Sequence, residues 1–485
     1  MATEPDVKGL YPKGRPLWQW SASGLRQGYL DGFITPVDVI TACLERIAQV
    51  NPAINAFVAE NTRVIEDAHA STQRYRRGQP QSNLDGIPVS IKDNLCTADM
   101  PTTWGTPALR HYSPRVDEIP VSRLRASGAL IVGKTNVPEF TLEGYTDNPL
   151  FGVTRNPWNT LLTPGGSSGG AVASVCAGCT PLAIGTDGGG SIRRPASHCG
   201  LAGLKPSIGS VARGKGLPAL LLDFEVVGPI ARTVGDLRML FEVLRGPNIL
   251  DHHSLAAQPR RPLADVHARV SKPLRILYVP TLNAAPVDAE IARSCQSAIE
   301  HFRAIGHQVS VGEIPLDLSR VLAGWATVGQ IGLAALFEQH PQWGDGASPK
   351  YLQMAKSGAQ VRAPELWTLI DAVTNLRAAC ADLFEQWDII AMPSAASLPW
   401  PAGQAYPSEI GGKTVGPRGH AIFTGWVNAA GLPAISVPTP PSDEGLPIGL
   451  QLIGAYAEDD FLIELARAYE NHSPWAHRWP DIFIP

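Results

Sequence analysis

Charge is scarce in this sequence, and neither sign is in clear excess. Only 17% of the 485 residues are charged, and 40 Lys and Arg stand against 44 Asp and Glu, a net charge of −4. Soluble domains usually carry about 25% charged residues. The lack of basic charge argues against binding to nucleic acid phosphates. A hydrophobic content of 44% with so little net charge excludes a disordered chain and predicts a large buried core.

Long hydrophobic runs are also missing, so the sequence predicts no membrane helix. We find no stretch of the roughly 18 uncharged apolar residues that such a helix needs. The best candidate, residues 217–230, is interrupted by Asp223, Glu225 and Pro229. Residues 1–16 are polar and carry no apolar run, so we expect no secretory signal there. These absences predict a cytoplasmic protein without membrane contact.

Cysteine is rare and scattered. The seven residues are an odd number, which is typical of reduced thiols in the cytoplasm. Cys176 and Cys179 form a CxxC, but they follow an apolar run of small residues and do not open a helix as a redox motif does. No second Cys or His pair stands at the spacing of a zinc site. We expect both thiols to pack in the core, and we expect neither a metal nor another cofactor.

Glycine and proline, by contrast, are abundant, with 47 and 43 residues. Proline at nearly twice its usual share of about 5% predicts many stiff turns and not a long helical bundle. Between the turns, short apolar runs alternate with helical patterns. This alternation predicts an α/β fold: a single large domain with a central mixed β-sheet covered by helices on both faces.

The pattern also gives the position of each element. A helix should start at the Thr35-Pro36 cap and stop at Asn51-Pro52. The expected strands are 87–91, 130–132, 182–186, 276–279, 309–311, 389–392, 435–437 and 450–453. The other expected helices are 62–77, 121–127, 168–177, 234–244, 288–305, 364–387, 420–429 and 459–469. The polar, aperiodic stretch 250–272 is expected to be a surface excursion or a linker between two lobes.

Two Gly/Ser-rich loops, 164–170 and 185–193, are the densest feature. Both adjoin strongly patterned segments, which argues against flexible linkers. A phosphate-binding loop would need a lysine after the glycines, and none follows. Residues 166–170 match GxSxG, but that motif follows a strand directly, whereas the preceding residues 156–164 are polar and end in proline.

The remaining interpretation is a serine nucleophile that a lysine activates. A hydroxyl needs a base, and lysine can serve where burial lowers its pKa. Lys92 ends an apolar strand, where lysine is unusual. The alternative is a lysine that reaches solvent or pairs with Asp93. Three glycines before Ser191 permit a tight curve whose N–H groups form an anion nest, as an oxyanion hole requires.

With these residues the chain resembles the amidase signature family of serine hydrolases over about residues 35–470. The matching motifs are GIPVSIKD at 86–93, GKTNVPEF at 133–140, NPLFG at 148–152, RNPW at 155–158, the block 164–206, NAAGLPA at 428–434 and GLPIGLQ at 445–451. The resemblance implies the family's fold, with an N-terminal segment at 1–34, an amidase signature domain at 35–472 whose catalytic core spans about 80–235, and a C-terminal tail at 473–485.

The resemblance also implies the site. Lys92 is the expected base, Ser167 the bridging serine on a cis peptide bond, and Ser191 the nucleophile. The implied oxyanion donors are the backbone N–H groups of Gly188, Gly189 and Gly190, and the implied loop-bracing pair is Asp187 with Arg193. Many members carry Thr or Ile at the position of Gly188, so we expect a looser loop here. The implied substrate-pocket residues are Thr141, Leu142, Glu143 and Tyr145, with Trp104 as a further wall.

The resemblance predicts hydrolysis of a carboxylic amide C–N bond through a Ser–cis-Ser–Lys triad and an acyl-enzyme. The segment at 141–148 departs from that of the glutamine-hydrolysing component of tRNA amidotransferases, and NPLFG is more similar to fatty acid amide hydrolase and stand-alone amidases. We therefore expect a soluble hydrolase of aryl or alkyl amides with ester or carbamate side activity, a small-molecule amide as partner, and a homodimeric assembly. The alternatives are the glutamine-hydrolysing component of a tRNA amidotransferase and a non-catalytic scaffold.

Overall fold

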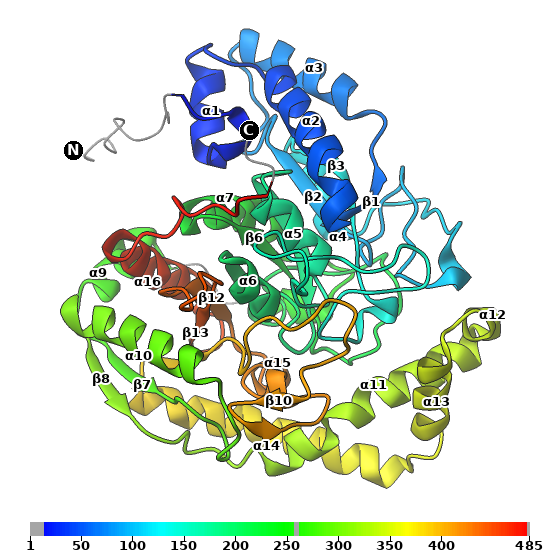
Figure 1. The fold of residues 1–485 in the computed structure, drawn as a ribbon, viewed down its shortest axis with the longest axis vertical. Helices are drawn as coiled ribbons and strands as arrows, with labels where there is room; N and C mark the ends of the chain where they lie inside the picture. The colour runs from blue at the N-terminus through cyan, green and yellow to red at the C-terminus, as the bar shows by residue number, and fades with distance from the viewer. Residues whose placement is uncertain (1–13, 257–260, 483–485) are drawn as a thin grey trace.

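A mixed sheet of eleven strands runs through the molecule (Figure 1). The computed structural model describes residues 14–256 and 261–482. The strand order is β1-β3-β2-β4-β6-β5-β12-β13-β9-β7-β8. Strand β2 pairs in parallel with β3 and β4, strand β7 pairs in parallel with β8 and β9, and the other neighbours are antiparallel. The expected mixed α/β sheet is confirmed.

The elements follow the chain in this order. The strands of the large sheet are β1 Phe57–Glu60, β2 Pro88–Lys92, β3 Leu130–Thr135, β4 Leu182–Asp187, β5 Ala202–Lys205, β6 Val226–Ala231, β7 Arg275–Tyr278, β8 Gln308–Val311, β9 Ile389–Pro393, β12 Ala434–Pro438 and β13 Gly449–Ile453, and a separate pair is β10 Glu409–Ile410 with β11 Lys413–Thr414. The α-helices are α1 Ala22–Leu30, α2 Pro36–Ile54, α3 Val64–Arg76, α4 Ile119–Ala126, α5 Gly169–Cys176, α6 Arg193–Cys199, α7 Val234–Leu244, α8 His252–Leu255, α9 Leu263–Val270, α10 Ala289–Ala304, α11 Ser319–Gln339, α12 Pro341–Asp345, α13 Pro349–Gly358, α14 Ala363–Gln386, α15 Gly425–Ala429 and α16 Asp459–His472. Short 3-10 helices are η2 Leu17–Gln19, η3 Pro107–Leu109, η4 Glu139–Thr141 and η5 Gly419–Ala421.

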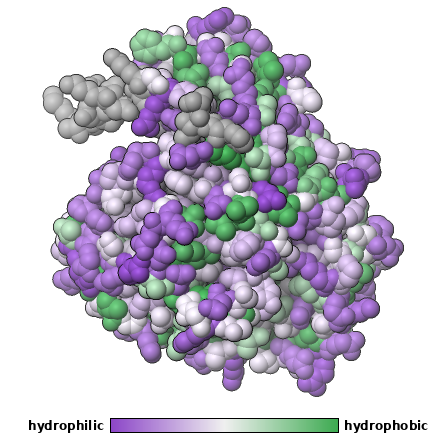
Figure 2. Space-filling model, viewed as in Figure 1, coloured by the Kyte–Doolittle hydropathy of each residue, from purple (hydrophilic) through white to green (hydrophobic). Residues whose placement is uncertain are grey.

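Alternate side chains of the strands pack into hydrophobic cores on opposite faces of the sheet. On β7, Ile276 and Tyr278 join the core formed with α10 and α16, while the adjacent Leu277 packs in the core formed with α11, α14 and α15. Successive side chains of a strand point to opposite faces. The sheet is therefore covered by helices on both faces, as expected, and Figure 1 shows α10 and α14 beside β7 and β8. On the face shown in Figure 2, hydrophobic side chains lie in small groups among hydrophilic ones.

The two ends of the described chain meet on one side of the molecule. The carboxylate of Asp236 accepts hydrogen bonds from the backbone N–H groups of Ala22 and Ser23, at 3.0 Å each. These N–H groups lie in the first turn of α1 and have no partner within the helix. The indole rings of Trp18 and Trp479 contact each other with centroids 5.3 Å apart. Hydrogen bonds and ring contacts thus tie both ends to the core around α7.

Most expected strands and helices lie within a few residues of the observed ones, but some boundaries differ. Helix α2 continues through Pro52, because a proline in the last turn removes only one backbone donor, and it ends where Asn55 adopts a left-handed conformation. The helix expected at 420–429 is divided into η5 and α15. Cys176 ends α5 as a free, fully buried thiol, which confirms the expected core packing.

The described residues of the stretch 250–272 lie mostly at the surface, as expected, but they contain two helices that the sequence analysis did not predict. These helices are α8 and α9, and residues 257–260 lie outside the description. Arg269 of α9 pairs with Glu458 at 3.0 Å, and its guanidinium lies over the Phe461 ring at 3.9 Å. Only Val266 of this helix is buried. Most of its contacts with α16 are made by charged side chains, and the polar composition of the stretch did not predict a helix.

Helix α11 is absent from the expected elements, although it is one of the longest. Its buried positions Val321, Trp325 and Val328 recur at helical spacing and pack in the core with α14 and α15. By length and composition it is the one helix among residues 14–256 and 261–482 that could cross a membrane, with 33% of its apolar window buried. Core helices also pass that criterion.

Candidate active site

The site forms where β2 and β4 end. Because these two strands are parallel neighbours, their carboxyl ends lie at the same edge of the sheet. Lys92 is the last residue of β2, and Asp187 is the last residue of β4. The loop that begins at Asp187 leads to Ser191 and then into α6, while the loop before α5 contributes Ser167. The parallel register therefore brings three separate sequence motifs together.

Lys92 is completely buried and meets only neutral oxygen atoms. Its Nζ donates to Ser167 Oγ at 2.8 Å, to Thr186 Oγ1 at 2.8 Å and to the Thr186 carbonyl at 3.2 Å. Burial lowers the pKa of Lys92 to about 7, a shift that the charges of Glu225 and Asp187 oppose. At neutral pH a large fraction of this amine is unprotonated, so it can act as a base.

Asp93 is not the partner of Lys92. Its carboxylate lies 3.3 Å from Nζ of Lys134 on the neighbouring strand β3. It also accepts the N–H of Thr103 at 3.1 Å. The alternative of an ion pair between Lys92 and the adjacent aspartate is therefore wrong, because Asp93 points to the other lysine.

The two adjacent serines of the first loop differ in their contacts. The peptide bond between Gly166 and Ser167 is cis, where the resemblance implied one. Ser167 Oγ accepts from Lys92, whereas Ser168 Oγ donates to the Thr186 carbonyl at 3.2 Å. Ser168, the serine of the GxSxG match, is thus bonded to the backbone. At Gly166 a Cβ would lie 2.4 Å from the Tyr145 carbonyl oxygen, so only glycine allows this close approach.

Asp187 and Arg193 hold the second loop in a fixed curve. Their side chains form a fully buried ion pair at 2.9 Å. Asp187 also accepts the N–H groups of Gly190 at 2.7 Å and Ile192 at 3.1 Å, and Asn428 donates to it at 3.0 Å. Burial alone would raise the pKa of Asp187, but Arg193, Asn428 and Lys205 hold it well below its ordinary value. The carboxylate is therefore charged and organises the loop.

The same bonds change the expected set of oxyanion donors. The N–H of Gly190 is engaged by Asp187, and its φ of 111° suits only glycine. The N–H groups of Gly188, Gly189 and Ser191 have no hydrogen-bond acceptor among the described residues. These three groups remain available to a ligand, whereas Gly190 shapes the curve.

Ser191 opens into a cavity of about 350 Å³. Its side chain is 7% exposed, and its carbonyl accepts the N–H of Ser168 at 3.2 Å, which links the two loops. Its hydroxyl has no hydrogen bond to any described residue. Thr141, Leu142 and Glu143 line the cavity, as the resemblance implies for the pocket.

Trp104 and Tyr145 do not belong to the lining of this cavity. Trp104 is buried behind it, where its Nε1 donates to Thr141 Oγ1 at 3.1 Å and its ring packs on Phe140. The hydroxyl of Tyr145 accepts from Lys350 Nζ at 3.0 Å. Both aromatic residues thus support lining residues from outside the cavity.

Several walls of the cavity come from segments that the sequence motifs do not mark. These further lining residues are Arg194, Leu221, Trp325, Ala326, Gly329, Gln330, Met354, Pro417, Arg418, His420 and Ala421. Most of them lie on α11, on α13 and around η5, far along the chain from the Gly/Ser loops. The helical spacing of apolar residues in α11 could have located one of these walls.

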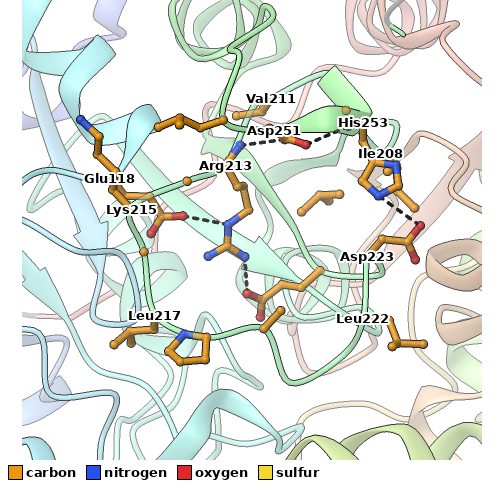
Figure 3. A pocket seen from close by; sticks show the side chains of 18 of the residues that line it. Glu118, Ile208, Val211, Arg213, Lys215, Leu217, Leu222, Asp223, Asp251 and His253 are labelled. Atoms are coloured by element: carbon orange, nitrogen blue, oxygen red, sulfur yellow. Dashed lines mark hydrogen bonds and ion pairs between the residues drawn. The ribbon is translucent and has the colours of Figure 1, made fainter. Parts of the chain in front are cut away.

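Figure 3 shows a second cavity, of about 360 Å³, which Arg213 and Glu118 line. Asn94 and Glu225 line it, and both are bonded to Thr186 Oγ1, at 3.0 and 3.3 Å. Arg213 crosses the cavity and pairs with Glu118 at 2.8 Å and with Glu225 at 2.6 Å. The charge of this arginine is therefore fully matched by carboxylates.

Known proteins resemble this chain over nearly its whole length. A sequence profile of the Amidase family matches residues 38–463. The A component of the glutamyl-tRNA(Gln) amidotransferase of Alkaliphilus metalliredigens (strain QYMF) is 33% identical over 476 residues, covering 92% of this chain and 95% of the relative. A bacterial aryl acylamidase of the amidase signature family superposes with a TM-score of 0.88 at 28% identity, covering 97% of this chain and 100% of that chain. For 6-aminohexanoate cyclic dimer hydrolase complexed with substrate the TM-score is 0.85 at 27% identity, with the same coverage.

Proposed function

This chain belongs to the amidase signature family, and from that premise we propose that Lys92, Ser167 and Ser191 hydrolyse a carboxylic amide through an acyl-enzyme. The observation that carries the proposal is the 2.8 Å contact between Ser167 Oγ and a buried lysine that has no carboxylate partner. A lysine whose pKa is lowered to about 7 has the affinity for protons that a base needs at neutral pH.

The proposed reaction has two halves. Neutral Lys92 takes a proton from Ser167 while Ser167 takes one from Ser191, and the Ser191 oxygen attacks the amide carbonyl. The tetrahedral oxyanion is bound by the free N–H groups of Gly188, Gly189 and Ser191. The relay then protonates the leaving amine as the C–N bond breaks. In the second half, water gives its proton to the same relay, attacks the ester, and releases the acid and Ser191.

The cavity supports an aryl or alkyl amide as substrate. Leu142, Leu221, Trp325 and Met354 give it an apolar part beside Ser191. Esters and carbamates offer the same attacked carbonyl, so we propose them as side substrates. The high structural similarity to an aryl acylamidase supports this class. We further propose a cytoplasmic enzyme with a small-molecule substrate, assembled as a homodimer, with residues 35–472 as its domain and about 80–235 as its catalytic core.

A second candidate function is hydrolysis of glutamine as the A component of a tRNA amidotransferase. The curated relatives carry that name, including the protein of Symbiobacterium thermophilum (strain DSM 24528 / JCM 14929 / IAM 14863 / T), which is 34% identical over 93% of this chain. That function would require partner chains. It predicts ammonia release from glutamine that a partner stimulates, whereas the first candidate predicts turnover of anilides by this chain alone.

One experiment tests the proposed function and separates these candidates. The purified chain is incubated with anilides, aliphatic amides, esters, carbamates and glutamine, and with a fluorophosphonate probe. We expect anilide turnover and covalent labelling of Ser191, and we expect both to be lost in Ser191→Ala, by about 10⁴-fold or more in kcat. The matched control is Ser168→Ala. An alanine variant at 191 that hydrolyses amides at a comparable rate, or a chain that the probe does not label, contradicts the proposal.

A further inference from the structure

The cavity at Ser191 holds a positive charge that no described residue neutralises. Arg418, which precedes η5, lines this cavity. Its guanidinium forms no ion pair and no hydrogen bond within residues 14–256 and 261–482, and it lies over the face of Trp325, 5.4 Å from the ring centroid. Arg418 is exposed to solvent, so its charge needs no partner within the protein. Its guanidinium is therefore free on the cavity wall to bind an anion that arrives with the ligand.

Of the other charged lining residues, Glu143 has an ion-pair partner, whereas Arg194 has only backbone acceptors and its buried Nε has none. Glu143 is paired with Lys350 at 3.0 Å, and although it attracts Arg418, it lies beyond ion-pair distance from it. Arg194 donates to the carbonyl of Gly189 at 2.9 Å and lies against the two Gly/Ser loops. In the cavity of Figure 3, by contrast, Arg213 has two carboxylate partners. Among the described lining residues, Arg418 is the cation whose guanidinium has no hydrogen-bond acceptor at all, and Arg194 adds a second positive charge without a carboxylate partner.

Desolvation at the cavity wall lowers the pKa of Arg418 to about 10, and the charge of Glu143 opposes this shift. A bound carboxylate would raise this pKa again, because an opposite charge favours the charged form. Guanidinium is the side chain best suited to a carboxylate, because its planar fork can donate two parallel hydrogen bonds.

His420 provides a second, independent unsatisfied polar group in the same wall. It lines the cavity with 3% of its surface exposed, and neither ring nitrogen has a hydrogen-bond partner among the described residues. Burial and the nearby Arg194 and Arg418 keep its pKa well below the ordinary value, so the ring is neutral. A neutral imidazole offers one N–H donor and one acceptor. Such a group can donate to a carboxylate that Arg418 binds.

We propose that this cavity selects amides that carry a carboxylate, and that Arg418 is the specificity-determining residue that binds it, with His420 as an additional donor. The inference rests on the proposed function of Ser191, because it identifies the substrate class of that site. It divides aryl and alkyl amides into those with an anionic group, which are preferred, and their neutral isosteres, which leave the guanidinium without an acceptor.

The test compares matched substrate pairs that differ only in charge. The first pair is glutaric acid monoanilide and its methyl ester, which place the carboxylate on the acyl side. The second pair is 4-acetamidobenzoate and its methyl ester, which place it on the amine side. For the wild-type chain, kcat/KM for anilide hydrolysis should favour the acid in at least one pair by roughly 10- to 100-fold, the range of a charge-assisted hydrogen bond. Which pair shows the preference identifies the side.

Variants at Arg418 test whether this residue causes the preference. In Arg418→Gln the ratio of kcat/KM between acid and ester should fall to about one, mainly through KM, and Arg418→Lys should retain part of it. Arg293→Gln is the matched control, because this arginine lies on α10 and pairs with an exposed aspartate; its ratio should equal that of the wild type. Equal rates for acid and ester in both pairs, or a preference that survives in Arg418→Gln, would overturn the proposal.

A binding measurement keeps the inference distinct from the proposed function. Titration calorimetry follows glutarate and the neutral glutaramide binding to the wild type, to Arg418→Gln and to Ser191→Ala. We expect glutarate to bind the wild type and Ser191→Ala, and to bind Arg418→Gln at least tenfold more weakly. If the chain hydrolyses no amide but glutarate binding depends on Arg418, the proposed function fails and the anion site stands. If amides are hydrolysed but glutarate binds no better than glutaramide, the anion site is refuted.

Discussion

Two fully buried lysines stand on neighbouring strands and have opposite surroundings. Lys134 on β3 lies 3.3 Å from the carboxylate of Asp93, and it also donates to Thr102 Oγ1 at 2.7 Å. Lys92 on β2 donates only to hydroxyl and carbonyl oxygens, those of Ser167 and Thr186. Burial lowers the pKa of both amines. The difference between them is therefore the presence of an ionic partner and not the depth at which they lie.

The comparison shows how one sheet edge can hold both a structural and a reactive lysine. An adjacent carboxylate favours the charged form of Lys134, so that amine serves as a fixed cation and donor. Lys92 has no such partner, so burial disfavours its charged form and lowers its pKa to about 7. The same strand end that places Lys92 at Ser167 places Asp93 toward the other lysine. Substitutions at these two lysines and at Thr186 test the contrast.

The largest effect is expected from Lys92→Met. Removing the proposed base should lower kcat/KM for an anilide by about 10³- to 10⁴-fold, because neither serine then has an acceptor for its proton. Circular dichroism and a urea titration check that the variant is folded. Retention of more than a tenth of the wild-type kcat/KM would show that another group serves as base.

The next effect is expected on stability, from Lys134→Met. This change leaves the carboxylate of Asp93 buried without its cation and should lower the free energy of unfolding by about 3–5 kcal/mol, measured in urea. The double variant Lys134→Met with Asp93→Asn should recover part of the loss, because no unpaired charge remains. If Lys134→Met is as stable as the wild type but inactive, the roles of the two lysines are reversed.

An effect of similar size concerns the pH dependence of stability in Lys92→Met. The folded-state pKa of about 7 lies below the unfolded value of about 10.4, so between these values the unfolded chain binds more protons. Wild-type stability should therefore rise with pH in this window relative to the variant. At pH 7 we expect Lys92→Met to be more stable than the wild type by about 4 kcal/mol, with most of this advantage gone near pH 10.5. A difference that does not change with pH would mean that Lys92 is charged in the folded chain.

The smallest effect is expected from Thr186→Val. This change removes the hydroxyl that accepts from Lys92 at 2.8 Å and keeps the carbonyl. Thr186 is a positioning residue, so we expect a loss of about tenfold in kcat and a lower midpoint of the pH–rate profile, because the charged amine loses an acceptor. Thr186→Ser should restore both. An unchanged midpoint with lowered kcat would indicate a structural role only.

The sequence motifs named residues that the structure brings together at one sheet edge, because each motif is a short local pattern. Asp187 and Arg193 stand six residues apart on one tight loop, and Lys92 is conspicuous on an apolar strand. The motifs did not predict that Asp187 accepts a hydrogen bond from the N–H of Gly190, since backbone hydrogen bonds depend on the conformation of the loop. The triad assignment itself remains a prediction until the variants above are measured.

The walls of the cavity were much less predictable. Arg418 and His420 lie more than 200 residues along the chain from Ser191, at the start of the helix expected over 420–429, and no sequence motif connects them with the Gly/Ser loops. Trp104 was expected to be a further wall, but it lines the second cavity and not the one at Ser191, and it donates a hydrogen bond to Thr141. Local pattern indicates which residues are buried, whereas the packing of α11 and α13 decides which of them face the ligand.

The most direct measurement of the central claim is the rate at which a fluorophosphonate probe labels Ser191 as a function of pH. Labelling needs the nucleophile and its base, but no substrate preference. We predict a rate that rises with pH to a plateau, with a midpoint near the pKa of about 7 of Lys92, and loss of the rise in Lys92→Met. A rate that is flat from acid to alkaline pH, or that first rises near the ordinary lysine pKa of about 10, would contradict a neutral Lys92 as the base.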